Sequence, residues 1–382
     1  MIEIVDKSSC TGCGACKNAC PVQAISMQLD EEGFLYPFVD LEKCIQCNRC
    51  DEVCHMIKAP AREAECMEVY AAYNKSKEML HQVSSGGAFW SMAEEMIRRG
   101  GVVYGVVMDG ALQVYHDRAT TLEECERFKR SKYLESHTGN IYSLVKKDIL
   151  EGREILFSGT GCQIAGLKSF LGEQNVDKLI TCDIVCHGVP SRNAFEGYIS
   201  EIEKQFDSKV IAINYRDKNN GWKRNHICIS FENGKMINEF SAINPLHGAY
   251  TQGLFYRPSC ASCRYACLPR IADITLADYW KYDGDLKKSN EDMGISLVVC
   301  NNEKGKLFFK QSAEGRMYID KSNLEMAQKS CRHLHLSPVE HKKRQQFFKL
   351  LKKKGFHKAV AICNHVPLRI KIKHFIKKVL KK

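Results

Sequence analysis

The sequence predicts a protein of mixed α and β structure in two parts: a small, cysteine-rich α+β module at the N-terminus and a larger α/β domain behind it. Three observations lead to this prediction. Eight of the 20 cysteines fall within the first 54 residues in a repeated spacing. From residue 69 onward, strand-like runs alternate with helix-like runs, as in an α/β domain. A chain of 382 residues also exceeds what one hydrophobic core usually supports.

The composition is that of an ordinary globular protein. Hydrophobic residues make up 44% and charged residues 26%, which excludes global disorder and collagen-like repeats. No apolar run reaches the ~18 residues of a membrane helix. The first residues show no export signal, so the predicted location is the cytoplasm. In that reducing compartment, clustered cysteines bind metal more often than they form disulfides.

The N-terminal module, residues 1–58, contains two cysteine runs with the spacing C-x2-C-x2-C-x3-C. This pattern is typical of bacterial ferredoxins with two 4Fe–4S clusters, in which the fourth cysteine of each run binds the other cluster. The first set is therefore Cys10, Cys13, Cys16 and Cys54, and the second set is Cys44, Cys47, Cys50 and Cys20. Zinc sites, the alternative, usually show cysteine pairs separated by a longer gap. Each half is expected to form a short hairpin and a helical turn.

The larger domain is predicted over residues 69–337, after a polar linker at 59–68. Its first signal is Ser84-Ser85-Gly86-Gly87, which precedes apolar residues at helical spacing up to Ile97. A loop of this kind, leading into a helix N-terminus, offers free backbone N–H groups to a phosphate. A serine N-cap with a flexible glycine is the alternative.

Two strand–turn–helix units follow, with strands expected at 154–157 and 178–185 and running parallel. Cys162 and Cys186 then lie just past the carboxyl ends of neighbouring strands, where ligands of open α/β sheets bind. Cys182 falls inside the second strand and is predicted to be a buried core thiol.

A further C-x2-C pair stands at Cys260 and Cys263, with Cys267 close behind. Together with the two cysteines at the strand ends, five thiols are available for the four positions of one metal site. The other cysteines have no partners in spacing and are expected to be ordinary thiols of the core. These are Cys66, Cys125, Cys228, Cys300, Cys331 and Cys363.

Several motifs together resemble a known family. The matching stretches are Ser84-Ser85-Gly86-Gly87, Ser131-Lys132-Tyr133 with Ser136, Phe157 to Leu167, Cys186-His187-Gly188-Val189-Pro190-Ser191, Tyr215-Arg216-Asp217-Lys218 with Gly221-Trp222, Arg257-Pro258-Ser259-Cys260 with Cys263, and Ala272-Asp273-Ile274-Thr275 with Asp278-Tyr279-Trp280. The chain resembles the beta subunits of coenzyme F420-reducing hydrogenases and dehydrogenases, in the bacterial branch with an N-terminal ferredoxin module. Plant 7-hydroxymethyl chlorophyll a reductase is related.

The resemblance implies a flavin-binding larger domain with FAD, a third 4Fe–4S cluster, and hydride exchange with coenzyme F420, a deazaflavin, or another two-electron acceptor. We assign the third cluster to a third set, Cys162, Cys186, Cys260 and Cys263, with Cys267 in reserve. The implied function is an iron–sulfur flavoprotein oxidoreductase that exchanges electrons with a redox partner protein or a ferredoxin. A non-catalytic electron-transfer subunit of a larger redox complex is the alternative.

The flavin contacts implied by the resemblance are Ser84, Ser85, Gly86, Gly87, Lys132, Tyr133 and Ser136. His187 and Lys132 are the candidate catalytic residues, and a hydrogen bond within its loop is the alternative role of His187. Three further cations, Arg216, Lys218 and Arg257, are expected either to bind an acidic acceptor or to be solvated. Asp273 and Asp278 are interpreted as cap or turn residues.

The segment 338–382 is a basic tail, in which Glu340 is the only acidic residue. After Pro367, apolar residues recur at helical spacing between lysines, so peripheral membrane contact is one interpretation. A terminal helix docked on the domain is the other. Because the basic charge belongs to the tail while the rest of the chain is nearly neutral, nucleic-acid binding is not predicted.

Overall fold

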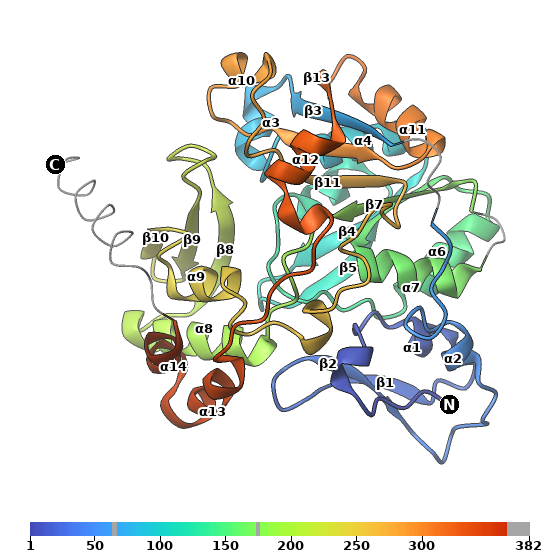
Figure 1. Cartoon of the computed structure of the whole chain (residues 1–382), viewed down its shortest axis with the longest axis vertical. Helices are drawn as coiled ribbons and strands as arrows, with labels where there is room; N and C mark the ends of the chain where they lie inside the picture. Colours follow the sequence, from blue (N-terminus) through green and yellow to red (C-terminus); the bar gives the residue numbers. More distant parts are fainter. Residues whose placement is uncertain (63–66, 173–175, 365–382) are drawn as a thin grey trace.

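The computed structural model describes residues 1–62, 67–172 and 176–364. A small N-terminal module lies against a larger mixed α/β domain, to which a third layer of strands and helices is attached (Figure 1). The predicted order of a ferredoxin-like module followed by a larger α/β domain is thereby confirmed. No helix in the described ranges is long and apolar enough to cross a membrane.

The N-terminal module is built around one hairpin. Its elements are η1 (Lys7–Ser9), α1 (Ala15–Ala19), β1 (Ile25–Leu29), β2 (Leu35–Val39) and α2 (Arg49–Glu52). Strands β1 and β2 pair antiparallel, with Ile25 opposite Val39. The expected second hairpin is wrong for residues 1–62, because the chain after Cys54 turns toward the larger domain, where His55 is buried.

The larger domain has an eight-stranded sheet in the order β13-β3-β12-β11-β7-β6-β4-β5. The strands are β3 (Glu68–Asn74), β4 (Val102–Met108), β5 (Val114–Ala119), β6 (Ile155–Thr160), β7 (Leu179–Ile184), β11 (Ile274–Asp278), β12 (Ser296–Cys300) and β13 (Met317–Ser322). Four neighbouring strands, β4, β6, β7 and β11, run parallel to one another. The strands on either side, β5 at one end and β12, β3 and β13 at the other, each pair antiparallel with their neighbours. The predicted parallel pair is confirmed, and Cys182 on β7 is fully buried as expected.

Helices cover both faces of this sheet. On one face, α4 (Ala88–Arg98) and α11 (Glu303–Ala313) pack over Val103 and Leu156. On the other, α6 (Ile141–Leu150) and α7 (Gly161–Leu171) pack over Val102 and Ile155, as side-chain alternation along the strands requires. Short elements complete the layers: α3 (Lys77–Gln82), α5 (Leu122–Cys125), η2 (Glu126–Phe128), η3 (Pro258–Cys260), α10 (Leu286–Ser289), α12 (Leu324–Ser330) and η4 (Arg332–Leu334).

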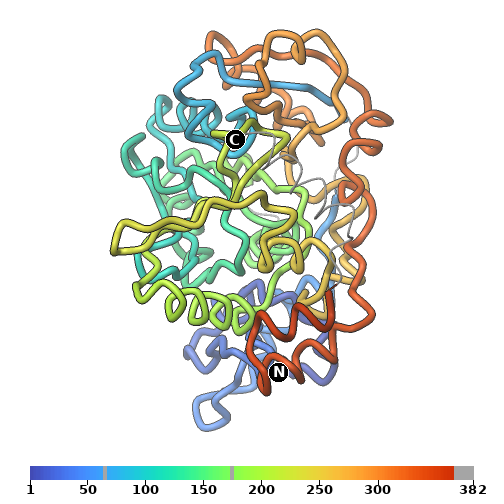
Figure 2. Tube along the Cα trace, turned by 90° about the vertical axis from the view of Figure 1, so that its left-hand side faces the viewer, coloured from blue at the N-terminus to red at the C-terminus, as the bar shows by residue number. Residues whose placement is uncertain are grey.

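The third layer contains a three-stranded antiparallel sheet and four helices. These are β8 (Val210–Asp217), β9 (His226–Phe231), β10 (Met236–Phe240), α8 (Arg192–Phe206), α9 (Pro245–Thr251), α13 (Arg344–Lys354) and α14 (Phe356–Cys363). The first part of the segment predicted as a tail thus forms two helices, whose Phe347 and Phe356 are fully buried in a core shared with α8 and β9. Figure 2 shows these C-terminal helices beside the N-terminal module. The amphipathic stretch after Pro367 lies outside the described residues.

Candidate functional site

The first set of cysteines gathers at the face of the module that meets the larger domain. Burial is the largest cause that raises the pKa of Cys16, to about 12, and the neighbouring Cys10 and Cys54 raise it further. Burial likewise raises the pKa of Cys13, with contributions from Cys16 and Cys10. Cys54, from the second run, therefore lies near Cys10 and Cys16 of the first run.

The second set lies on the outer side of the module. Cys20, Cys44, Cys47 and Cys50 line one small cavity. Cys47 is exposed to solvent, and the nearby Ile45 is also exposed. The structure thus places the four cysteines of this predicted set around a common space close to the surface.

The third set comes together from two strand ends and one loop of the larger domain. Burial raises the pKa of Cys162 to about 12, and Cys263 and Cys186 add to this rise. Burial also raises the pKa of Cys260, again with contributions from Cys186 and Cys162. Two backbone N–H groups donate to these sulfurs, Gly188 to Cys186 and Val189 to Cys260, each at 3.3 Å.

Cys267 is held apart from this group. Its Sγ donates to the carbonyl oxygen of Arg264 at 3.0 Å and lies in close contact with the guanidinium of Arg62. Among the described residues, no three His, Cys, Asp or Glu side chains converge tightly enough to hold a single metal ion. Sets of four sulfur donors are the ligands that iron–sulfur clusters use.

The first set adjoins the third set across helix α7. A Cβ atom placed on Gly166 of α7 would lie only 2.9 Å from the Sγ of Cys13. Next to this contact, the Oη of Tyr265 and the Nδ1 of His55 share a hydrogen bond of 2.6 Å. The other ring nitrogen of His55 bonds the hydroxyl of Thr11 at 3.0 Å. His55 follows Cys54 at the position where Pro21 follows Cys20 in the first run, so the two runs differ at this point.

A cavity of about 580 Å³ extends from the Ser84–Gly87 loop to Cys162 and Cys186. Thr11 and Gly12 of the module also line it. Its volume lies within the usual range of ligand and cofactor sites, about 300–1,000 Å³. The third set, and the loop between Cys10 and Cys13 of the first set, therefore border the space in which a cofactor can bind.

The Ser84–Gly87 loop presents the N-terminus of α4 to this cavity. The N-cap of α4 is Gly87, with φ of +82° and no side-chain cap, so the predicted alternative of a serine N-cap is wrong. The serines instead fix the loop: Ser84 accepts from the backbone N–H of Ser131 at 2.8 Å, and Ser85 donates to the carbonyl of Ile295 at 3.0 Å. The first N–H groups of α4 remain available for an anionic ligand.

The residues at 132–136 line the same cavity but differ in their contacts. The Nζ of Lys132 donates to the carbonyl oxygens of Lys129 and Arg127, at 2.8 and 3.0 Å, and burial lowers its pKa to about 7. Tyr133 accepts a hydrogen bond from Arg216 at 3.4 Å. Ser136 is buried and bonds both His116 and Gln163, which the sequence did not single out.

His187 lies between this cavity and a second one. The second cavity has a volume of about 670 Å³ and shares His187, Thr251, Arg332 and His333 with the first. The Nε2 of His187 lies 3.0 Å from the carbonyl oxygen of Thr251, and burial lowers the pKa of the imidazole. The ring centroids of His187 and His333 lie 4.5 Å apart.

Three cations expected to be either ligands or solvated charges are all buried, so solvation is wrong for each of them. Arg216, Lys218 and Arg257 are 7%, 6% and 1% exposed. Lys218 donates to three backbone carbonyls, including that of Ser85 at 2.7 Å, and burial lowers its pKa to about 7. Through the bond to Ser85, Lys218 holds the Ser84–Gly87 loop in place.

Arg216 faces the cavity with part of its guanidinium unpaired. It pairs with Asp278 at 2.8 Å and lies 4.9 Å from the ring centroid of Trp280, yet its Nε and Nη2 are buried without a hydrogen-bond partner. Asp278 ends β11 and also accepts from Trp222 at 2.9 Å, so its interpretation as a cap or turn residue is wrong. Asp273 is likewise no cap, because it is buried and accepts from Thr181.

The remaining cysteines agree in most cases with their predicted place in the core. Cys125, Cys300, Cys331 and Cys363 are buried. Cys228 on β9 is only partly buried, and Cys66 lies outside the described residues.

Comparison with known proteins places the two parts of the chain. Residues 152–325 match the family model that describes the C terminus of the coenzyme F420 hydrogenase/dehydrogenase beta subunit. Residues 9–56 match the 4Fe–4S dicluster domain. Residues 152–325 thus match the coenzyme F420 hydrogenase/dehydrogenase beta-subunit family, which confirms the predicted resemblance. The loops at 84–87 and 131–136 lie outside both matched ranges.

Two individual proteins are also similar to this chain. An uncharacterized ferredoxin of Methanocaldococcus jannaschii is 39% identical over 51 residues, which are 13% of this chain and 65% of that ferredoxin. A chain in a structure of the F420-reducing NiFe hydrogenase complex from Methanosarcina barkeri aligns with a TM-score of 0.48 and 16% identity. That alignment covers 76% of this chain and 94% of the other.

Proposed function

We propose that the protein is a cytoplasmic iron–sulfur flavoprotein oxidoreductase. It passes electrons between 4Fe–4S clusters and FAD and exchanges hydride with coenzyme F420 or another two-electron acceptor. One observation supports this most strongly: a single cavity is bordered by the Ser84–Gly87 loop, by Cys162 and Cys186, and by Thr11 and Gly12 of the dicluster module. Cluster ligands and a cofactor-sized space thus adjoin.

The residues present fit a phosphate-bearing cofactor. The N-terminus of α4 and the unpaired nitrogens of Arg216 border the same cavity, and both favour an anion. A buried guanidinium with two unpartnered nitrogens is costly unless a ligand completes it. When bound, FAD supplies the conversion between single electrons and electron pairs. We assign its phosphates to Ser84, Ser85, Gly86, Gly87 and Arg216.

The cysteine sets form a path from the surface to the cavity. The second set lies outermost, beside the exposed Leu41 and Ile45, which are 71% and 61% exposed, and suits contact with a redox partner protein or a ferredoxin. The first set follows, and the Gly166 contact brings it to the third set. Each set consists of four cysteines, as a 4Fe–4S cluster requires.

Two side chains are suited to hold or move a proton beside the cavity. The pKa of Lys132, about 7, lets its Nζ gain or lose a proton near neutral pH. His187 is anchored at Nε2 by the carbonyl of Thr251, so its Nδ1 is the atom left for proton exchange with a bound molecule.

The proposal is tested by purifying the full chain under argon. We expect released FAD and about twelve irons, four for each of three clusters. About eight irons without flavin would contradict it and support the non-catalytic electron-transfer subunit. Reduction of the anaerobic protein, followed by addition of deazaflavin, nicotinamide or quinone, identifies the acceptor from the one that reoxidises the flavin.

A further inference from the structure

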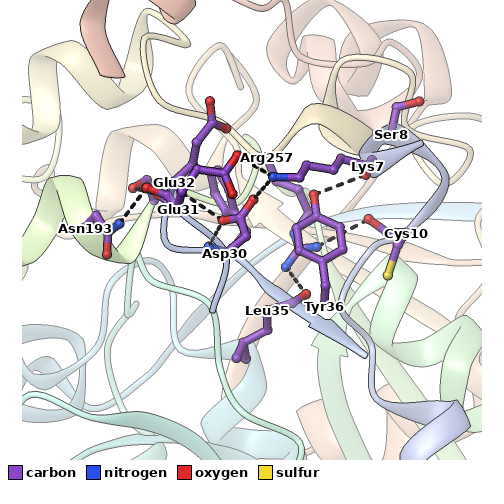
Figure 3. Close-up of polar contacts among 12 residues, drawn as sticks. Lys7, Ser8, Cys10, Asp30, Glu31, Glu32, Leu35, Tyr36, Asn193 and Arg257 are labelled. Atoms are coloured by element: carbon purple, nitrogen blue, oxygen red, sulfur yellow. Dashed lines mark hydrogen bonds and ion pairs between the residues drawn. The ribbon is translucent and has the colours of Figure 1, made fainter. Parts of the chain in front are cut away.

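Arg257 is a buried cation at the junction between the dicluster module and the larger domain. Its side chain is fully buried and forms an ion pair of 2.7 Å with Glu135. The guanidinium donates to the carbonyl oxygens of Leu35 and Cys10, at 2.8 and 3.3 Å (Figure 3). It also lies 4.8 Å from the ring centroid of Tyr36. One charge is thus held by two segments of the module, the Cys10 loop and β2, and by Glu135 of the larger domain.

The ion pair packs directly on the loop of the first set. A Cβ atom on Gly12, between Cys10 and Cys13, would lie 2.4 Å from Glu135 and 2.5 Å from Arg257. The φ of Gly12 is +72°, so glycine suits both the backbone and the space. The first cysteine loop therefore lies against the pair with no side chain between them.

The backbone of Arg257 belongs to the loop of the third set. Its carbonyl oxygen accepts from the N–H of Cys260 at 3.0 Å, and its own N–H donates to Val189 at 2.9 Å. Val189 in turn donates to the sulfur of Cys260. The charge of Arg257 acts on thiols of both sets, Cys10 in one and Cys162 and Cys260 in the other.

We propose that Arg257 and Glu135 are positioning residues that set the relative reduction potentials of the first and third clusters. This rests on the proposed function, because it requires clusters at both sets. Reduction makes a cluster more negative, so a nearby buried cation stabilises the reduced form and raises its potential. The guanidinium lies against the first cysteine loop, where Arg257 is the largest charge effect on Cys10 and Glu135 opposes it only in part. At Cys162 and Cys260 of the third set, Arg257 is the least of the contributions. The pair therefore favours electrons on the first cluster.

The test is a redox titration of the anaerobic full chain followed by paramagnetic resonance. Arg257→Gln is expected to lower the ratio of reduced to oxidised first cluster about tenfold at a fixed potential, which equals a shift of about 59 mV for one electron. Arg257→Lys keeps the charge and should restore most of the potential. Glu135→Gln should raise the potential of the first cluster and so move the two potentials further apart.

Arg344→Gln is the matched control. Arg344 is also a buried arginine, pairs with Glu32 of the module, and lies 5.8 Å from the ring of Phe34, which Arg257 approaches to 5.4 Å. It belongs to the same junction but not to a cysteine loop. Its loss should leave all potentials within error, even if it weakens the junction.

The possible failures are distinguishable. Equal shifts in Arg257→Gln, Arg257→Lys and Arg344→Gln would overturn the inference, since they would indicate a purely structural role. Three clusters with unchanged potentials in Arg257→Gln would overturn it while leaving the proposed function intact. A parent protein without a third cluster would overturn both.

Discussion

Arg216 leaves two buried nitrogens unpaired in the cavity wall, which makes its contribution to ligand binding measurable. Hydrogen bonds to a charged group contribute about 1.5–3 kcal/mol, so Arg216→Gln should weaken FAD binding roughly ten- to hundredfold. Equilibrium dialysis of the flavin-depleted protein measures this. Arg118→Gln is the control, because Arg118 pairs with Asp148 and does not line the cavity. Equal affinities of the parent, Arg216→Gln and Arg118→Gln for FAD would show that Arg216 does not bind the phosphates.

Cys263 and Cys267 are neighbours in the sequence, but only Cys263 lies with the third set. Cys263 acts on Cys162 and Cys186, whereas the sulfur of Cys267 contacts Arg264 and Arg62 instead. Cys267→Ser should therefore keep about twelve irons, and Cys263→Ser should keep about eight. Iron analysis together with the resonance signal of the reduced protein decides the matter. Loss of a cluster in Cys267→Ser alone would reassign the fourth ligand.

Lys132 couples stability to pH through its low pKa. The folded value of about 7 lies below the ordinary 10.5, so the unfolded chain binds more protons between these values. The free energy of unfolding therefore rises with pH across that window, and this contribution is lost as pH falls through 7. Lys132→Met should reduce the slope by up to about 1.4 kcal/mol per pH unit.

Urea unfolding of the anaerobic protein at pH 7, 8 and 9 measures this slope. Lys147→Met, at an exposed position of α6, is the matched lysine removal and should leave the slope unchanged. Parallel pH profiles for the parent and Lys132→Met would show that Lys132 is not titrating in this range.

At the scale of elements, the site depends on how strands end and helices begin. Strands β6 and β7 are parallel neighbours in register, with Ser158 opposite Cys182, so the turns after them place Cys162 and Cys186 at one edge. The loop before α4 is held at the same edge because the N–H of Gly86 donates to Ser296 on β12.

Gly86 is a position where a single methyl group should disturb this edge. A Cβ atom there would lie 2.2 Å from the carbonyl oxygen of Ala72 and 2.7 Å from the amide nitrogen of Ser296, both of which are backbone atoms. Gly86→Ala should cost about 1–3 kcal/mol of stability and weaken cofactor binding. Gly110→Ala, which meets open space, should change stability by less than about 0.5 kcal/mol in a parallel unfolding series. Similar losses in both variants would exclude this packing argument.

For the whole molecule, the sequence predicts those features that local patterns encode. The spacing of Cys10 to Cys54 specifies two clusters, and strand–turn–helix order specifies where Cys162 and Cys186 lie. The many lysines of α13 and α14 led to the prediction of a basic tail, although Phe347, Phe348 and Phe356 indicated an apolar helix face. The contact of Arg257 with Cys10 joins residues 247 positions apart, and no local periodicity records which distant loops meet.

The contact between the module and α7 provides a test at this scale. On helix propensity alone, Gly166→Ala should stabilise α7 by about 1 kcal/mol. The added methyl group would, however, lie 2.9 Å from the Sγ of Cys13, which the first cluster would hold in place. The module should therefore shift away from α7, and flavin bleaching after rapid reduction by dithionite should slow. Gly197→Ala in α8 gains similar propensity, and its added methyl group meets Leu351 at 3.3 Å and Phe356 but no cysteine, so flavin bleaching in this variant should proceed at the parent rate. A parent-like rate in Gly166→Ala would show that electrons reach the cavity by another path.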